Sequence, residues 1–280
     1  MSTAPLSITT VQGILIVLPT AQFGVRDVDE NLSRITGTST WAACFLYPVD
    51  RRAVLPYDRL GKFVGDEWNM MAKQPVHWNE EARGSAVERL SASGGMIVAP
   101  TKVGYIVMTT DRSGLERKFE AKQRPLSKPG VVLVSSLEML RDLAELNPEI
   151  EALYEHCWKE DILLGCILPW RPTAVSQIPD DGSESLVMDD RSTSCFVIRF
   201  GTPAEEIAGD LWSQHHLLSF ASSANPSGKG NRGVLDGIGD RIFHAADLLV
   251  EADDYVASVQ PDRTVETRWE QGVMVSMVDS

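Results

Sequence analysis

The chain has 280 residues, of which 43% are hydrophobic and 23% charged, a balance typical of a globular protein with a full buried core. It carries 26 lysines and arginines against 39 aspartates and glutamates, and the resulting net charge of −13 argues against direct, high-affinity nucleic-acid binding, because cationic contacts to phosphates supply most of that affinity. The N-terminus lacks a signal-peptide pattern and no apolar run approaches the length of a membrane span, so we expect a cytoplasmic protein without membrane contacts.

The cysteines and histidines predict neither disulfides nor a metal site. Cys44, Cys157, Cys166 and Cys195 show no Cys-x-x-Cys spacing, which favours reduced, packed thiols. The five histidines are isolated or directly adjacent, and neither arrangement suits a pair of metal ligands on a helix. We therefore expect no metal held by protein side chains.

Residues 1–83 are predicted to form an N-terminal α/β extension of unknown role. Strands are predicted at Gly13–Thr20 and Trp41–Val49, and apolar residues at helical spacing predict a helix within Asp58–Lys73. The segment is not rich in Gly, Ser or charge, so we expect it to pack rather than to serve as a linker.

The second region, residues 84–280, begins beside a helix predicted at Glu80–Ser91. Met96–Ala99 and Tyr105–Met108 are short apolar runs with β-branched residues, which is typical of buried strands. Pro100 closes the first run, and Gly104 precedes the second.

A helix is predicted to follow these strands. Ser113 is its expected N-cap, and Glu116 three residues later would complete a capping box. The apolar residues of this helix are expected to dock on the sheet, which would leave Lys118 and Lys122 on other parts of its surface.

The remaining pattern predicts alternating strands and helices and therefore an α/β sandwich of mixed strand direction. The expected elements are a strand at Val131–Val134, a helix capped by Ser135 with Glu138, a helix at Glu149–Trp158, strands at Gly165–Trp170 and Cys195–Phe200, a helix capped by Thr202 with Pro203 and Glu205, a strand at Leu217–Ala221, a helix at Asp240–Leu249 and a strand at Gly272–Met277. Between them, Gln177–Arg191 is acidic and rich in Asp, Ser and Gly, which predicts an exposed loop, either a lid or a passive insertion.

A basic cluster follows the helix that is predicted to begin at Ser113. Lys122 and Arg124 lie at its exit, and Lys128 follows in the next turn. Such a cluster is either a solvated basic face that opposes the helix dipole or a site for a phosphorylated ligand.

Small polar residues follow the strand predicted at Leu217–Ala221. Ser222, Ser223 and Asn225 would lie at its end, where open α/β sheets bind ligands, although a polar turn would use the same residues. The next segment, Pro226–Gly230, is not a Walker loop, because it lacks the first glycine and the Ser or Thr after lysine.

Together these segments resemble a known family. The run GGMIVAPTKVGY, then Lys122-x-Arg124, Lys128-Pro129 and Ser223-Ala224-Asn225-x-Ser227-Gly228, resembles the YrdC family of threonylcarbamoyl-adenylate synthases and their relatives, from about Ala86 to the C-terminus. The resemblance implies a twisted mixed sheet with flanking helices and a nucleotide-binding domain over residues 84–280. It also implies that the basic cluster and the Ser-Ala-Asn loop fold back to enclose a single pocket.

The resemblance assigns roles to particular residues. Lys122 and Arg124 would be catalytic and would face the triphosphate of ATP, which is bound with Mg²⁺. Thr101 and Tyr105 would bind the amino-acid or carbamate end of the substrate. The nucleotide-binding residues would be Lys128, Ser222, Ser223 and Asn225, with Arg199 and Arg232 as weaker candidates.

The implied activity is the ATP-dependent formation of an N-carbamoyl-aminoacyl adenylate from ATP, bicarbonate and an amino acid, with release of pyrophosphate. Threonine, for tRNA modification, is the usual amino acid of the family. Lys102 departs from the family pattern, so a carbamoyl adenylate or another acyl adenylate of a biosynthetic pathway stays an alternative. A third possibility is a non-catalytic nucleotide-binding module with the same fold.

Overall fold

The computed structural model describes residues 6–11, 14–19, 74–126, 128–227, 229–263 and 273–278. In the first two of these ranges, β1 (Leu6–Val11) and β2 (Ile14–Pro19) form a two-stranded sheet. The predicted strand at Gly13–Thr20 is therefore confirmed. The strand predicted at Trp41–Val49 and the helix predicted within Asp58–Lys73 lie outside the described residues.

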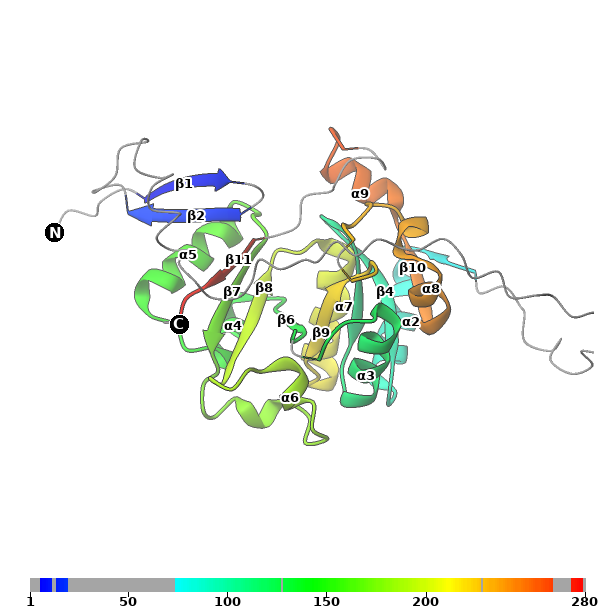
Figure 1. The fold of residues 1–280 in the computed structure, drawn as a ribbon, viewed down its shortest axis with the longest axis horizontal. Helices are drawn as coiled ribbons and strands as arrows, with labels where there is room; N and C mark the ends of the chain where they lie inside the picture. The colour runs from blue at the N-terminus through cyan, green and yellow to red at the C-terminus, as the bar shows by residue number, and fades with distance from the viewer. Residues whose placement is uncertain are drawn as a thin grey trace, which may run out of the picture. The chain divides into compact units, whose positions relative to one another are not determined.

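A second, nine-stranded sheet forms the centre of the region that contains Lys73–Ser280 (Figure 1). Its strands lie in the order β11-β7-β8-β6-β9-β5-β4-β10-β3, with both parallel and antiparallel neighbours, as the predicted mixed sheet requires. They are β3 (Val76–His77), β4 (Met96–Thr101), β5 (Gly104–Thr109), β6 (Val131–Leu133), β7 (Leu164–Pro169), β8 (Thr193–Ile198), β9 (Ser219–Ser223), β10 (Leu248–Glu251) and β11 (Val273–Ser276).

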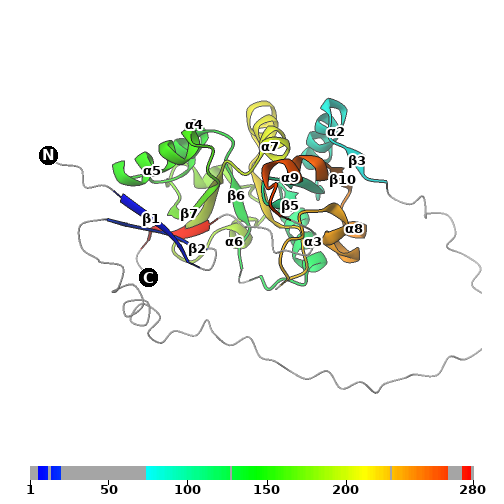
Figure 2. The same ribbon diagram turned by 90° about the horizontal axis from the view of Figure 1, so that it is seen from above.

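Helices cover both faces of this sheet (Figure 2). They are α2 (Glu80–Ser91), α3 (Arg112–Lys122), α4 (Leu137–Leu143), α5 (Pro148–Lys159), α6 (Glu184–Val187), α7 (Thr202–His215), α8 (Asp240–Ala245) and α9 (Asp253–Val259), with short 3₁₀ helices at Val175–Gln177 and Leu235–Ile238. Because successive strand residues point to opposite faces, Ile97 and Ile106 pack with α2 and α7, whereas Met96 and Tyr105 pack with α8. No helix in the described ranges is long and apolar enough to cross a membrane.

Three predicted helix caps are wrong by one or two residues. Asp111, not Ser113, caps α3, and its carboxylate accepts hydrogen bonds from the main-chain nitrogens of Gly114 (2.8 Å) and Gly94 (2.6 Å). A carboxylate that can satisfy both nitrogens at once is the better cap. Ser136 replaces Ser135 at the start of α4.

The third cap, at the start of α7, is Gly201 rather than Thr202. Its φ of 119° lies in the region that favours glycine, and a Cβ there would lie 2.6 Å from the main-chain nitrogen of Lys102. The predicted partner Glu205 does reach back, because its carboxylate accepts a hydrogen bond from the nitrogen of Gly201 at 3.2 Å.

Two further predictions are corrected by tertiary packing. The segment Gln177–Arg191 is not simply an exposed loop, because it contains α6 with Leu186 and Val187 buried, and the main-chain oxygen of Leu186 accepts a hydrogen bond from Gly130. The helix predicted at Asp240–Leu249 ends at Ala245, and the residues after it enter the sheet as β10 between β4 and β3. Strand pairing outweighs local helix propensity there.

Candidate active site

A cavity of about 240 Å³ opens beside β5, β6, β8 and β9. It is lined by Thr101, Val103, Ile106, Arg124, Val131, Leu133, Leu163, Gly165, Val197, Phe200, Ala221, Ser222, Ser223 and Asn231. Most of these residues are apolar. The polar ones are Arg124 just after α3, Ser222 and Ser223 at the end of β9, Thr101 at the end of β4, and Asn231. Among the described lining residues none is acidic, so the charge at the cavity is positive.

The structure brings the basic cluster and the Ser-Ala-Asn loop together. The buried ammonium of Lys122 donates hydrogen bonds to the main-chain oxygens of Ser223 and, at 2.9 Å, Asn225. In return, the main-chain nitrogen of Ser227 donates to the oxygen of Lys122 at 3.3 Å. Lys122 therefore joins the end of α3 to the end of β9 and does not itself line the cavity.

Arg124 is the cation that lines the cavity. It lies just beyond Gln123, whose φ of 51° turns the chain at the end of α3. Its guanidinium donates to the main-chain oxygens of Lys128 (3.0 Å) and Pro129 (3.5 Å), and burial lowers its pKa from the ordinary arginine value. Main-chain oxygens leave its full charge uncompensated, which suits an anionic ligand.

The loop after β9 presents unsatisfied polar atoms. The Oγ atom of Ser222 and the Oδ1 atom of Asn225 are buried without a hydrogen-bond partner. Ser222 pairs with Val107 on the Tyr105 face of β5, so its side chain points away from the cavity, whereas Ser223 pairs with Ile106 and lies on the cavity face. Asn225 donates through Nδ2 to the oxygen of Pro226 at 3.0 Å and to that of Lys229. Ser223 is therefore the β9 residue whose hydroxyl lies on the cavity face.

Thr101 closes the cavity at the end of β4. It is fully buried, donates through Oγ1 to the oxygen of Gly104 at 2.6 Å, and accepts from the nitrogen of Val103 at 3.2 Å. Gly104 has a φ of 101°, and a Cβ there would lie 2.2 Å from Oδ1 of Asn231. Only glycine therefore fits this turn.

The structure does not bring Tyr105 to the cavity. The strand alternation points its ring to the opposite face from Ile106, and its hydroxyl donates to Asp253 at 2.5 Å and accepts from the nitrogen of Ala252 at 3.0 Å. Burial and the hydrogen bond to Asp253 raise the pKa of the phenol well above its usual value. Tyr105 thus links β5 to the start of α9.

We expect Tyr105→Phe to lower the free energy of unfolding by about 1–3 kcal/mol, because the buried nitrogen of Ala252 and the carboxylate of Asp253 lose a partner. Urea unfolding measures this change. Unchanged stability together with a raised KM would instead support the predicted substrate contact.

The remaining predicted cations lie elsewhere. Arg199 has a φ of 54°, forms an ion pair with Asp161 at 2.6 Å, and lies over the ring of Trp158 with 4.9 Å between Cζ and the ring centroid. Arg232 lines a separate hollow of about 450 Å³, and Lys128 is exposed. None of these three lines the cavity beside Arg124.

Sequence patterns missed two polar residues of this region. Asn231 lines the cavity and donates through Nδ2 to the oxygen of Tyr105 at 3.0 Å. Lys118, predicted on the helix surface, is completely buried, as is most of Lys122. Their spacing of four residues places both on one helix face and could have indicated a shared environment.

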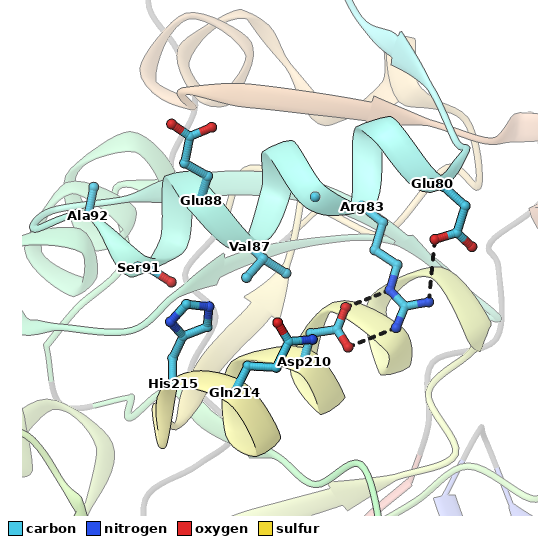
Figure 3. Close-up of a pocket in the computed structure, with 10 residues that line it drawn as sticks. Glu80, Arg83, Val87, Glu88, Ser91, Ala92, Asp210, Gln214 and His215 are labelled. Atoms are coloured by element: carbon cyan, nitrogen blue, oxygen red, sulfur yellow. Dashed lines mark hydrogen bonds and ion pairs between the residues drawn. The ribbon is translucent and has the colours of Figure 1, made fainter.

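A larger hollow of about 770 Å³ lies between α2 and α7, away from these residues (Figure 3). Its arginine, Arg83, points to Asp210, with two hydrogen bonds of 2.6 and 2.8 Å, and also pairs with Glu206 at 3.2 Å and Glu80 at 3.8 Å. The acidic side chains already neutralise this cation, so the hollow offers no free positive charge for a phosphate.

The hydrogen bonds from Arg83 lower the pKa of Asp210 below its ordinary 3.8. A lowered folded-state pKa means that the pair stabilises the protein at neutral pH and that this contribution is lost as pH falls through the folded-state pKa. We expect Asp210→Asn to lower the unfolding free energy at pH 7 by about 1–3 kcal/mol. The difference in unfolding free energy between wild type and Asp210→Asn should shrink as the pH falls below 3.8, the ordinary pKa of aspartate. Glu80→Gln, at an exposed pair, is the matched control and should change little. An undiminished difference at low pH would contradict the linkage.

The fold and cavity define a YrdC-like α/β protein: a large twisted mixed sheet with flanking helices and, among the described residues, a cationic cavity beside the ends of α3 and β9. The chain belongs to the Sua5/YciO/YrdC family, whose model, described as "Telomere recombination", matches residues 89–275.

Individual relatives agree with this assignment. The chain is 25% identical over 179 residues to a threonylcarbamoyl-AMP synthase of Pyrococcus abyssi (strain GE5 / Orsay), a match that covers 63% of this chain and 48% of the relative. The chain therefore spans about half the length of that curated relative.

Two solved structures are also similar. The hypothetical protein smu.1377c from Streptococcus mutans UA159 is 55% identical with a TM-score of 0.69, over 74% of this chain and 80% of the other. YciO of E. coli has a TM-score of 0.54 at 16% identity, over 74% of this chain and 92% of the other, which shows a shared fold.

Proposed function

We propose that the protein is an ATP-dependent adenylating enzyme that forms an N-carbamoyl-aminoacyl adenylate from ATP, bicarbonate and an amino acid and releases pyrophosphate. One observation carries this proposal: Arg124, Ser222 and Ser223 converge on a single cavity whose described lining contains no acidic residue. A cavity with uncompensated positive charge and a serine hydroxyl on its face suits the phosphates of a nucleotide. The threonylcarbamoyl-AMP synthase relative supports the same chemistry.

The residues suit the proposed reaction. The amino group of the amino acid would first react with bicarbonate to give a carbamate and water. A carbamate oxygen would then attack the α-phosphorus of ATP, form a new P–O bond, and break the bond to the bridging oxygen, so that pyrophosphate leaves with the electron pair. Negative charge then grows on the phosphate oxygens. Arg124 would stabilise it with a planar, always-charged guanidinium, and Ser223 would donate its hydroxyl.

Lys122 would act by shaping this site. Its two hydrogen bonds to the Ser223 and Asn225 oxygens hold the loop against the end of α3. Burial, and then the charge of Arg124, lower the pKa of Lys122 to about 7, so an incoming phosphate would favour its charged form.

The magnesium ion would arrive bound to the phosphates of ATP, as part of the substrate. No group of three His, Cys, Asp or Glu residues within the described ranges could hold a metal ion. The ion would screen the phosphate charges, and Arg124 would provide the protein's positive charge.

The other end of the cavity would hold the acyl group. Thr101 lies there beside apolar residues such as Val103, Leu163 and Phe200. The side chain of Lys102 is bound to Asp161 rather than placed in the cavity. A second candidate function is therefore the same activation of a more apolar amino acid or another acyl group, instead of threonine for tRNA modification.

The decisive experiment incubates the full chain with ATP, Mg²⁺ and bicarbonate, with and without threonine or other amino acids. Pyrophosphate release that depends on both bicarbonate and an amino acid is the expected result, and mass spectrometry of the adenylate identifies the acyl group. Turnover with carbamoyl phosphate alone would support carbamoyl-adenylate formation. ATP binding without turnover on any of these substrates would contradict the proposed activity and favour a nucleotide-binding module.

A further inference from the structure

Lys118 is a buried lysine without a partner. Its side chain is fully buried on α3, and its Nζ atom has no hydrogen-bond acceptor in the described structure. The nearest favourable group is the ring of Phe119, whose centroid lies 5.0 Å from Nζ. An unpaired buried ammonium is costly, because it loses its hydration without gaining an ion pair. This cost favours a functional role for Lys118 over a purely structural one.

Lys118 lies directly behind the wall of the cavity. A Cβ built on Gly130 would lie 2.7 Å from Nζ of Lys118 and 3.7 Å from the main-chain oxygen of Ala221. Gly130 precedes the lining residue Val131, and Ala221 lines the cavity itself. One layer of main chain thus separates Lys118 from the candidate site.

The charged groups that act on Lys118 are cations. Arg124 follows the end of the same helix, and Lys122 lies one turn later on it. Burial has the largest effect and, with repulsion from Arg124 and then Lys122, lowers the pKa of Lys118 to about 7. The neighbouring segments, Gly130 and Ala221, carry no charged side chain. Near neutral pH, the amine is therefore poised between its neutral and its charged form.

We infer that Lys118 is a ligand-linked proton acceptor, which takes up a proton from solvent when a polyphosphate binds beside Arg124 and then adds a hidden positive charge to the site. This inference rests on the proposed function, since the bound anion is the nucleotide triphosphate. The proton balance is simple: the neutral amine and one solvent proton become an ammonium, and no bond of the nucleotide changes.

The direction of the pH dependence follows. A bound anion raises the pKa of Lys118, so binding takes up protons, and the extra affinity is complete at low pH and is lost as pH rises through the pKa of the bound form. A unit charge on the order of 10 Å from the ligand, at an effective dielectric constant of about 20, changes a binding constant by roughly tenfold.

Calorimetric titration of the full chain with MgATP, in two buffers of different ionisation enthalpy at pH 8, tests this inference. Wild type should take up part of one proton per ATP, and Lys118→Met should take up less, because the share of Lys118 is lost while Lys122 can still titrate. The same titrations at pH 6, where Lys118 is charged, should show Lys118→Met binding ATP about tenfold more weakly than wild type, and this difference should shrink at pH 8. Methionine is apolar and similar in length, so Lys118→Met should also unfold at the same or a higher temperature. Lys118→Leu, as a second apolar replacement, should behave in the same way.

Three results would overturn the inference. Equal proton uptake by wild type and both variants would show that another group titrates, and unchanged ATP affinity in both variants would show that the Lys118 charge is not felt by the ligand. A lowered unfolding temperature with unchanged proton uptake would show a purely structural residue. These results need only ATP binding, so they can be told apart from a failure of the proposed reaction. ATP binding without proton uptake by Lys118 would contradict the inference alone. If neither MgATP nor pyrophosphate bound, the proposed function would be contradicted as well.

Discussion

Arg124→Ala should reduce ATP-dependent pyrophosphate release, measured as kcat/KM, by about 100-fold or more. Arg124 is the cation that lines the cavity among the described residues, and it faces no carboxylate there. Removal of a positioned cationic donor in a partly dry site typically costs two to three orders of magnitude, because water and distant charges cannot replace it. Arg124→Lys should restore only part of the activity, since lysine cannot offer two parallel hydrogen bonds.

The loss should occur without a large change in stability. The hydrogen bonds of Arg124 go to main-chain oxygens at the partly exposed Lys128–Pro129 segment, so we expect the unfolding free energy to change by no more than about 1 kcal/mol. Arg112→Ala is the matched control, because Arg112 lies at the other end of α3 in an exposed ion pair with Glu116. A kcat/KM for Arg124→Ala within threefold of that control would remove Arg124 from the proposed mechanism.

Lys122→Met should damage both stability and binding. The ammonium is the donor that satisfies the main-chain oxygens of Ser223 and Asn225, and methionine would leave these groups without it. We expect the unfolding free energy to fall by about 2–4 kcal/mol and ATP affinity to fall at least roughly tenfold, since the loop that presents Ser223 loses its anchor. Chemical unfolding and ATP titration at a temperature where both proteins are folded measure the two effects.

Lys118→Met is the matched comparison, since the two lysines lie one turn apart on α3 and are both buried. The substitution is the same, but Lys118 leaves no hydrogen-bond acceptor behind. Lys122→Met should therefore lower the unfolding free energy, whereas Lys118→Met should leave it unchanged or raise it. Equal stability of Lys122→Met and wild type would show that the lysine does not hold the loop.

Sequence patterns predicted this fold in considerable detail, because most elements carry a strong local signal. The run Met96–Ala99 is apolar and β-branched, and it is a buried strand in the structure. The helix predicted at Glu80–Ser91 matches α2 at both ends. At its N-terminus, the side chain of Asn79 accepts a hydrogen bond from the main-chain nitrogen of Ala82. Caps were predicted less well, because the residues that cap α3, α4 and α7 are Asp111, Ser136 and Gly201, which lie within two residues of the predicted Ser113, Ser135 and Thr202.

The sequence by itself determined which chemical groups this protein can bring to an anion: Arg124, Ser222 and Ser223 follow apolar segments whose periodicity marks the ends of a helix and a strand. Only the tertiary structure decided how they are used. Pairing of β5 with β9 brings the Ser223 segment to α3, and strand alternation turns Tyr105 away from the cavity. Burial likewise separates Lys122, which holds two main-chain oxygens, from Lys118, which holds none. Such differences depend on contacts between residues far apart in the chain, and local periodicity contains no information about them.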